Sequence, residues 1–539
     1  MERLTEDEAS ARTAVAAGPR GPTGAGGGSR RDLSALARGG ALNLVGGAAD
    51  AILGFLLVIV VTRGLGPVAA GPFFVAVALF KILSNTAELG ADTGLMRMIP
   101  RYRVLGRIHD IRRSLVVGLG PVVLVATVLG TAAFVLAPQL SRVLSRGDPG
   151  QISPYIRLMA PFLPLSALLT VSLAATRGFG TMLPAVAVDR IGRAGLQPLL
   201  VFAAIASGLG TGAIALAWAV PIGIGTVAAV AWLLRLLEGA ERGVAPPSGP
   251  GAPTRSLAGE FWRFTAPRGL AGFFHVSMLW LATLLLGALA STREAGIYAA
   301  STRYLLVGTL AGVAVLQVTG PKISELLASH DRERASVLYQ TATAWLMTLV
   351  WPLYLTIAIF APLLLDAFGP GFASGQAPLL ILAVTMLVTT GTGPVDVVLL
   401  MGGKSSWNLL NTLVAVTLNV VLNIVLIPRF GIVGAAVAWS ASLLVNNLAP
   451  LVQVRRFLGL HPFGSAYPRV VLAALASFGA IGVVVRVVAG TSLPAFVLSL
   501  ALSSVVYVGL LWTFRDALRL RVLRAALWPS GARPVVPAG

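Results

Sequence analysis

The chain has 539 residues, of which 56% are hydrophobic and 12% are charged, and its formal net charge is +20. A soluble globular domain carries roughly 25% charged residues, so this composition excludes an ordinary soluble protein and indicates that lipid surrounds most of the surface. The sequence has no cysteine, and its four histidines are scattered without metal-ligand spacing. Disulfides, thiolate metal sites and cysteine nucleophiles are therefore excluded, and we expect neither a metal site nor an enzyme.

Roughly fourteen apolar stretches follow one another from about Leu42 to Phe514. Each is long enough to cross a bilayer, for which a helix needs about 20 residues. Backbone groups must be paired inside a bilayer, and the stretches lack the period-two alternation of a β-barrel, so they indicate helices. The predicted fold class is an all-α, polytopic membrane protein. The predicted spans are at about 41–62, 71–95, 114–137, 156–176, 182–207, 211–234, 264–288, 297–320, 340–365, 377–401, 406–427, 432–453, 470–488 and 493–514.

The strong positive charge is explained by topology, because Lys and Arg mark the cytoplasmic loops of membrane proteins. An even number of spans places both termini on one side. With a cytoplasmic N terminus, about 29 of the 41 Lys and Arg fall in cytoplasmic segments and about six in outer ones. The charge therefore requires no nucleic acid partner. We predict a multi-pass protein of the cell (plasma) membrane with both termini cytoplasmic.

Two segments lack the apolar residues that a packed core needs. One contains the run GPRGPTGAGGGSRR near the N terminus, and the other contains the run APPSGPGAP. An internal repeat supports a division of the spans at the second of these segments. GTGAIALAW from Gly210, which leads into the sixth span, matches GIVGAAVAW from Gly431, which leads into the twelfth, at four of nine positions. A six-span repeat has even parity, which favours two lobes of the same orientation. The predicted segments are a disordered cytoplasmic tail (1–37), an N-terminal six-helix lobe (38–240), a cytoplasmic linker (241–258), a C-terminal six-helix lobe (259–458), two extra transmembrane helices (459–516) and a cytoplasmic tail (517–539).

A longer pattern covers the first two predicted spans. It reads GFLLVIVVTRGLGPVAAGPFFVAVALFKILSNTAELGADTGLMRMIPRYR from Gly54 to Arg103. Its TR and LG pairs, the glycine-aromatic start of the second span and the ELG…D…RYR exit resemble the opening of Wzx-type polysaccharide flippases. Weaker echoes occur at ATRGFG from Ala175 and at MGGK from Met401. That family belongs to the multidrug/oligosaccharidyl-lipid/polysaccharide exporter superfamily, whose fold has two six-helix lobes around a central cavity.

The resemblance implies a flippase that carries an undecaprenyl-(pyro)phosphate-linked oligosaccharide from the cytoplasmic to the outer leaflet by alternating access. A polar sugar and a phosphate head must then cross the bilayer while the lipid tail remains in it. The cavity must accordingly be wet, cationic and open sideways to the membrane. Charged side chains inside the spans are the residues to consider. Each would cost about 2.5–3.5 kcal/mol if it faced lipid at the centre of the bilayer, so those present should face the interior of the helix bundle.

Four arginines are the candidate ligands of the substrate head group. Arg190 and Arg193 follow Asp189 in the fifth span, where positions 189 and 193 lie one turn apart. One arginine can pair with the carboxylate and the other is spare for pyrophosphate oxygens, with a purely structural pair as the alternative. Arg268 and Arg303 in the seventh and eighth spans have no acid nearby in the sequence and are the better candidates. Their alternative is pairing between helices.

Acidic residues supply candidates for a gate and for ion coupling. Glu88, Asp92 and Arg97 at the exit of the second span could pair across the lobes in one conformation and separate in the other, or form a static cap network. Asp50 in the first span and Asp396 in the tenth are the candidate ion-coupling carboxylates, and the alternative for both is pairing with an arginine. We expect no bound cofactor, with H⁺ or Na⁺ as the candidate coupling ion.

Asparagines of the eleventh span supply the candidate sugar contacts. Asn411 and Asn419 lie on one face together with other asparagines, and amides suit sugar hydroxyls. The alternative is hydrogen bonding between helices, worth about 0.6 kcal/mol on average.

Other functions are open to the same sequence. A lipid II-type flippase or a cation-coupled multidrug extruder of the same superfamily would share the fold. A membrane glycosyltransferase would need acids on a sizeable outer loop, and the first predicted outer loop, GLGPVAAG, has none. We expect the partners to be the membrane and a lipid-linked oligosaccharide, with a polysaccharide polymerase or glycosyltransferases as candidate protein partners, and we expect a monomer.

Overall fold

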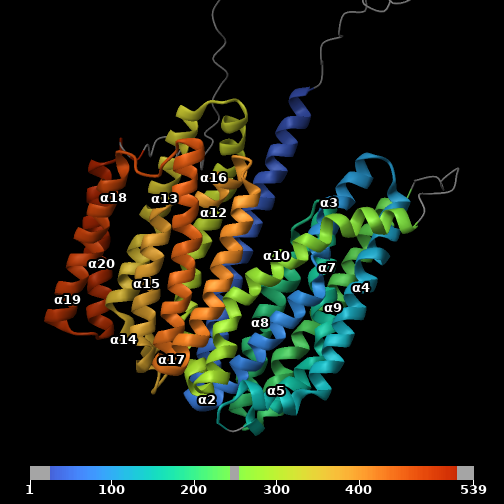
Figure 1. Cartoon of the computed structure of the whole chain (residues 1–539), viewed down its shortest axis with the longest axis horizontal. Coiled ribbons are helices and arrows are strands. Elements are labelled where there is room, and N and C mark those ends of the chain that lie inside the picture. The colour runs from blue at the N-terminus through green and yellow to red at the C-terminus, as the bar shows by residue number, and fades with distance from the viewer. Residues whose placement is uncertain (1–24, 148, 243–253, 517, 519–539) are drawn as a thin grey trace, which may run out of the picture.

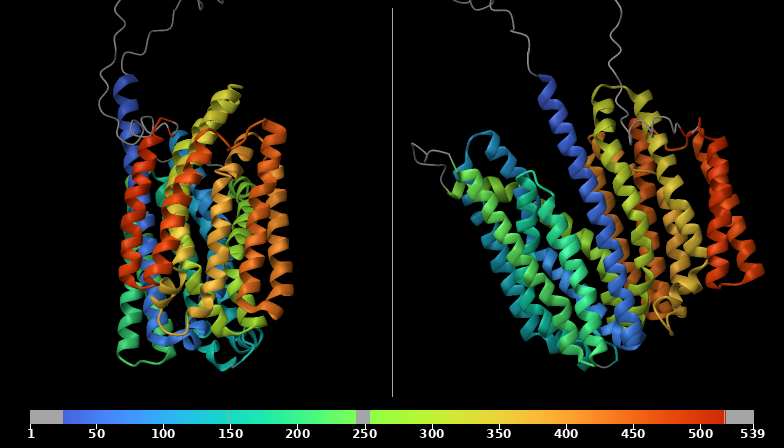
Figure 2. Two further views of the ribbon diagram at one scale, coloured as in Figure 1. Left: turned by 90° about the vertical axis from the view of Figure 1, so that its left-hand side faces the viewer. Right: turned by 180° about the vertical axis from the view of Figure 1, so that it is seen from behind.

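The protein folds into two groups of long helices. The structure is a computed structural model that describes residues 25–147, 149–242, 254–516 and 518. This part of the chain is helical and contains no strand, which confirms the all-α class. Figure 1 shows that the two groups approach each other at one end and diverge at the other, and Figure 2 shows the same from behind. We call these the closed end and the open end.

Ten segments of the described chain are long and apolar enough to cross a membrane, so the protein is a multi-pass membrane protein. The predicted number of fourteen spans stays a prediction. Side chains on the outer surface fit a lipid environment, because Val227, Val487, Val488 and Val505 are 72–81% exposed. Apolar side chains at such exposure would be a liability in water, whereas lipid solvates them.

The first group follows the chain up to the predicted linker. It consists of α2 (Ala25–Glu88), α3 (Ala91–Val104), α4 (Ile108–Val135), α5 (Ala137–Leu144), η1 (Pro149–Gln151), α6 (Ser153–Met159), η2 (Ala160–Phe162), α7 (Leu163–Gly178), η3 (Ala185–Arg193), α8 (Ala194–Ala206) and α9 (Thr211–Glu241).

The second group follows the linker. It consists of α11 (Thr292–Ser301), α12 (Arg303–Ala328), α13 (Arg332–Ile359), α14 (Ala361–Asp366), η4 (Ala373–Gly375), α15 (Gln376–Gly391), α16 (Val395–Met401) and α17 (Ser405–Leu458). At its outer edge lie α18 (Ala466–Ala474), η5 (Leu475–Ile481), α19 (Gly482–Ala489) and α20 (Leu493–Thr513), as Figure 1 shows.

Two helices are too long to cross a bilayer once. At 1.5 Å per residue, α2 (Ala25–Glu88) would measure about 96 Å if it were straight, roughly three times the hydrocarbon thickness. Gly66 interrupts α2 with a φ of 70°, and Gly431 interrupts α17 with a φ of 52°. Glycine adopts this left-handed backbone without a steric penalty. Each helix therefore has a first arm before the glycine and a second arm after it.

One helix connects the two groups. α10 (Thr254–Leu289) packs Leu257 and Phe261, near its beginning, into the same buried cluster as Leu95 and Met98 of α3. Further along, α10 contacts α2, α11 and α17. It begins within the segment 241–258 that we predicted as a linker, and the predicted segment limits as a whole stay predictions.

A large apolar cluster joins the groups near the closed end. Phe73 and Phe74 of the second arm of α2 are 1% and 2% exposed, and they share this cluster with Phe368 of the second group. A polar contact also crosses there, since Arg63 Nε donates to the carbonyl oxygen of Ala367 at 2.8 Å. Helices in lipid associate through close packing and hydrogen bonds, so these contacts hold the closed end together.

Candidate functional site

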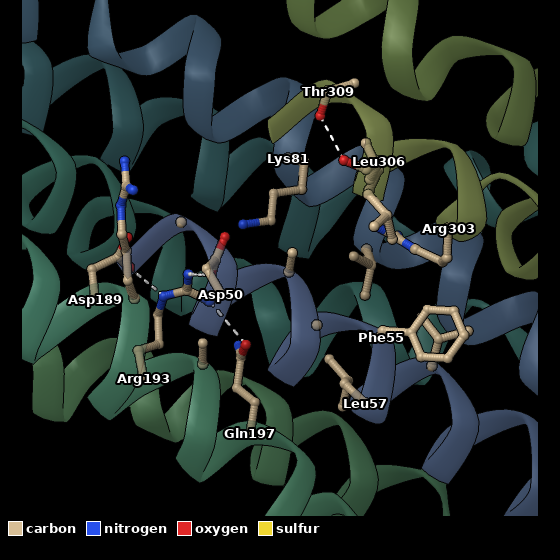
Figure 3. Close-up of a pocket in the computed structure, with 18 of the residues that line it drawn as sticks. Asp50, Phe55, Leu57, Lys81, Asp189, Arg193, Gln197, Arg303, Leu306 and Thr309 are labelled. Carbon is tan, nitrogen blue, oxygen red and sulfur yellow. Dashed lines mark hydrogen bonds and ion pairs between the residues drawn. The ribbon is translucent and has the colours of Figure 1, made fainter. Parts of the chain in front are cut away.

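A charged cavity of about 550 Å³ lies between the two groups of helices, on the open side of Phe73 and Phe74. Both arms of α2, η3, α8 and α9 form one wall, which we call the first wall. α10 and α12 form the opposite wall, which we call the second wall. Figure 3 shows the side chains that project into the space. A volume of this size falls within the roughly 300–1,000 Å³ of typical ligand sites.

Helical spacing explains which side chains of α2 reach the cavity. On its first arm, Asn43, Gly47, Asp50 and Gly54 follow one another at intervals of three or four residues, which places them on one face. On its second arm, Lys81 lies one turn beyond Val77 on the face that lines the cavity. The two arms therefore contribute one acid and one base to the first wall.

The segment η3 positions the remaining charges of the first wall. It is a π-helix, a form that frequently marks functional sites, and it carries Asp189, Arg190 and Arg193. Arg193 Nε donates to Asp189 Oδ1 at 2.5 Å, and Arg190 Nη1 donates to the carbonyl oxygen of Asn43 at 2.7 Å. Arg193 thus pairs with Asp189, as their spacing indicates, while Arg190 is tied to the α2 backbone.

Arg193 is the centre of a connected network. Its Nη1 donates to Gln197 Oε1 at 2.9 Å, and Gln197 Nε2 donates to the carbonyl oxygen of Trp218 at 2.9 Å. Its Nη2 lies 3.8 Å from Asp50 Oδ1 on the first arm of α2. The Arg193 side chain is only 14% exposed, so these partners fix its orientation. Apart from Lys81, the charged side chains of the first wall therefore form a pre-formed set of hydrogen bonds and ion pairs.

The second wall presents a cation without an acidic partner. Arg303 Cζ lies 5.1 Å from the ring centroid of Trp280, and Arg303 Nε is buried without a hydrogen-bond partner in the described chain. Neither Arg303 nor Lys81 has a carboxylate oxygen within 4.0 Å among the described residues. Figure 3 shows Lys81 beside Asp50, with Arg303 further along the cavity.

The charges of the cavity do not balance. Four basic side chains line it (Lys81, Arg190, Arg193 and Arg303), against the two acidic side chains Asp50 and Asp189. The excess of two positive charges lies in a partly enclosed space inside a membrane protein, where electrostatic attraction is stronger than in water. The cavity is therefore suited to an anionic group that carries more than one charge.

The predicted gate residues lie away from the cavity, where α2 meets α3. Glu88 is 8% exposed, while Arg97 stacks on Phe264 of α10 with its Cζ 4.1 Å from the ring centroid. No ion pair joins Arg97 to Glu88 or Asp92 in this part of the structure. Their role as a gate stays a prediction.

The ELG motif has a packing role at this same junction. Gly90 has a φ of 76°, and a Cβ at Gly90 would lie 2.5 Å from the backbone nitrogen of Gly269 in α10. A side chain at either glycine would push the two backbones apart. The RYR part of the motif adds an ion pair, in which Arg101 of α3 contacts Glu260 of α10. The motif therefore attaches the first group to α10.

The other predicted site residues lie outside the set of residues that lines the cavity. Arg268 is exposed on α10 and shares Phe264 with Arg97, its Cζ 5.7 Å from the ring centroid. Asp396 lies in the first turn of α16. Of the predicted headgroup ligands, the structure brings Arg190, Arg193 and Arg303 together.

The asparagines predicted to contact sugar make contacts within α17. Asn411 and Gln453 exchange two side-chain hydrogen bonds between the arms of α17, at 2.7 and 2.9 Å. Asn419 is 1% exposed and accepts from Asn423 Nδ2 at 3.2 Å. The Asn411–Gln453 contact fits the alternative that we kept open, hydrogen bonding between helices, whereas the Asn419–Asn423 contact lies within one arm of α17.

Several cavity residues had no assigned role in the sequence analysis. Lys81 was noticeable as a base in an apolar span, and Trp218 ends the repeated stretch GTGAIALAW. Gln197 gave no such signal, because a single amide in a span is ordinary. Its role depends on contact with α9, which the sequence pattern does not show.

These features define the class of the protein. It is an all-helical, multi-pass membrane protein with a charged cavity between two groups of helices, which is the architecture of a membrane transporter. Residues 36–327, more than half of the chain, match the family of polysaccharide biosynthesis proteins. The chain belongs to this family, which includes the Wzx-type flippases that its opening motif resembles.

Curated relatives and a solved structure agree with this assignment. The chain is 25% identical over 206 residues to a probable low-salt glycan biosynthesis flippase of Haloferax volcanii, covering 37% of this chain and 42% of that protein. It is 27% identical over 274 residues to the probable flippase AglR of the same organism, covering 47% of this chain and 56% of AglR. The chain thus spans about half the length of the curated relatives it matches.

The solved structure shows the fold. The lipid II flippase MurJ in an inward closed conformation superposes with a TM-score of 0.68 over 88% of this chain and 98% of MurJ, at 12% identity. At this identity the likeness concerns architecture alone. The chain therefore shares the helical fold of MurJ.

Proposed function

We propose that this protein is a flippase for a lipid-linked oligosaccharide, with the phosphate part of the head group bound in the charged cavity and the lipid tail in the bilayer. The observation that supports this most strongly is the convergence of Lys81, Arg193 and Arg303 from both walls on one space. Charges buried in a membrane protein are costly, so an excess of cations in its interior points to an anionic substrate.

The finer features of the proposal follow from the family. The carrier is undecaprenyl (pyro)phosphate, and movement runs from the cytoplasmic to the outer leaflet by alternating access. The open end faces the cytoplasm, and both termini lie there in the cell membrane. H⁺ or Na⁺ is the candidate coupling ion, with Asp50 and Asp396 as its candidate carboxylates. Support for the direction comes from the open end, where the arginine-rich turn between α3 and α4 lies.

The same cavity bears on the alternatives. An organic cation, the substrate class of a multidrug extruder, would meet an excess of positive charge there. A lipid II-type substrate carries the same kind of phosphate linkage as a polysaccharide intermediate and is accepted equally well by these cations. The charge of the cavity therefore favours a glycolipid phosphate over a drug.

The proposal is tested in cells that lack the gene. We expect lipid-linked oligosaccharides to accumulate in the inner leaflet, as measured by mass spectrometry combined with labelling from each side of the membrane. Complementation with the wild-type gene should restore their exposure in the outer leaflet, and Arg303→Glu should fail to do so at equal expression. Unchanged glycolipids together with increased drug sensitivity would contradict the proposal and favour an extruder.

A further inference from the structure

We propose that Asp50 is an internal counter-anion of the cavity, which neutralises Arg193 in the empty protein and is displaced by a phosphate group of the incoming ligand. This inference rests on the proposed function, because it assumes a ligand that carries phosphate. It assigns Asp50 a role in setting affinity and release. The basis is the unequal way in which the two carboxylates of the first wall are held.

Asp189 is held firmly, whereas Asp50 is held loosely. Asp189 lies on the same π-helix as Arg193, one turn away, and accepts its Nε hydrogen bond at 2.5 Å. Asp50 lies on a different helix, 3.8 Å from Arg193 Nη2, which is beyond hydrogen-bond distance. The side chain of Asp50 is 50% exposed, against 34% for Asp189. Exchange of Asp50 for another anion therefore breaks no hydrogen bond to Arg193.

Arg193 is oriented to accept that exchange. Asp189 accepts the hydrogen bond from its Nε and Gln197 accepts the one from its Nη1, so these two donors stay occupied when a ligand arrives. Only Nη2 points toward the weakly held Asp50. Figure 3 shows Asp50 between Arg193 and Lys81, at the position that a shared anion would take. A phosphate oxygen there would accept a charge-assisted hydrogen bond, which is shorter and stronger than the present 3.8 Å contact.

The total charge suits the ligand while Asp50 remains in the cavity, and repulsion at close range explains why Asp50 must move away from Arg193. A diphosphate diester bears one negative charge on each phosphate, which matches the excess of two positive charges in the cavity. If Asp50 stayed against Arg193, its carboxylate would repel the ligand at close range. Once the ligand leaves, Asp50 returns to Arg193. The Asp50 carboxylate therefore competes with the phosphate of the ligand for Arg193. This competition lowers affinity and assists release, as a transporter needs.

The experiment measures binding of inorganic pyrophosphate to the purified full-length protein by titration calorimetry at low ionic strength. Asp50→Asn removes the competing charge and keeps the shape, so we expect about five- to tenfold tighter binding than wild type. Asp50→Glu keeps the charge and should bind within about twofold of wild type. Asp516→Asn is the matched control, because it removes one exposed carboxylate beyond α20, and it should leave the affinity unchanged.

The outcomes separate this inference from the proposed function. Tighter binding by Asp50→Asn alone supports the role of Asp50 as a counter-anion, because a substitution that only damaged the cavity would not raise its affinity for pyrophosphate. Equal or weaker binding by Asp50→Asn overturns it, and so does absence of binding in both proteins. The proposed function is judged separately by the leaflet distribution of glycolipids in the deletion strain. If Asp50→Asn loses transport while its pyrophosphate affinity equals that of wild type, the residue has a coupling role and the counter-anion is rejected.

Discussion

The two walls of the cavity use positive charge in different ways. On the first wall, Arg193 is joined to Asp189, Gln197 and Asp50 in one network. On the second wall, the guanidinium of Arg303 packs against the ring of Trp280 and has no carboxylate oxygen within 4.0 Å in the described chain. A cation with an acidic partner contributes to the structure before any ligand arrives. A cation without an acidic partner gains most from a ligand, so the two walls should respond differently to substitution.

The largest expected effect is on stability, at the first wall. Arg193→Gln leaves Asp189 and Asp50 without their cation, so we expect the free energy of unfolding to fall by about 2–3 kcal/mol, somewhat less than for a fully buried pair because both acids are partly exposed. Thermal unfolding in detergent measures this. The double variant Asp189→Asn with Arg193→Gln should recover part of the loss. Wild-type stability of Arg193→Gln alone would show that the network is not structural.

The next effect is on function, at the second wall. Arg303→Gln should leave the unfolding temperature nearly unchanged and weaken pyrophosphate binding at least tenfold, because a desolvated ionic contact to a ligand is worth about 2 kcal/mol or more. Arg303→Lys should keep part of the affinity. A large loss of stability with little loss of binding would reverse the contrast between the walls.

Arg268→Gln is the matched comparison for Arg303. Our sequence analysis placed both arginines at the head group, whereas the structure places Arg268 on the exposed face of α10 beside Phe264. From this position we expect a change in affinity of no more than about twofold, as for an exposed charge at a distance. A loss equal to that of Arg303→Gln would support the original assignment of Arg268 and would require α10 to move when the ligand binds.

The smallest effect is expected away from both walls. Asn411 and Gln453 exchange two hydrogen bonds within α17, so a double-mutant cycle with Asn411→Leu and Gln453→Leu should give a coupling of about 0.6 kcal/mol. Transport should remain close to wild type in both single variants. A strong loss of transport without loss of stability would instead support the predicted contact of Asn411 with sugar.

The helical fold was predictable because it depends on properties that a short window of sequence contains. Apolar length fixes the spans, and the spacing of Asp189 and Arg193 correctly indicates their pairing. The motif from Gly54 to Arg103 identified the family, although its glycines and arginines turn out to secure helix contacts such as that of Gly90 with α10. Local sequence therefore gave the class of the protein and many of its parts.

The composition of the cavity was only partly predictable, because it depends on contacts between distant segments. Asp50 and Arg193 are separated by more than a hundred residues, and the choice between Arg268 and Arg303 depends on the rotation of α10 and α12 about their axes. The hydropathy of a span predicts its length well, but in this chain it does not predict which face of the helix lines the cavity. The π-helical course of η3 adds a shift that regular helical spacing cannot anticipate.

That shift makes the lining of the cavity sensitive to the number of residues in the π-helical segment. A π-helical turn accommodates one residue more than an α-helical turn, and a single residue corresponds to about 100° of rotation. Deleting one residue from the segment Ala185–Arg193 would restore an ordinary helix, leave the flanking helices in place and shift the side chains between them by one position. Hydropathy would hardly change, yet another side chain would replace the guanidinium. A one-residue gap at this place in an alignment therefore marks a relative with different binding chemistry.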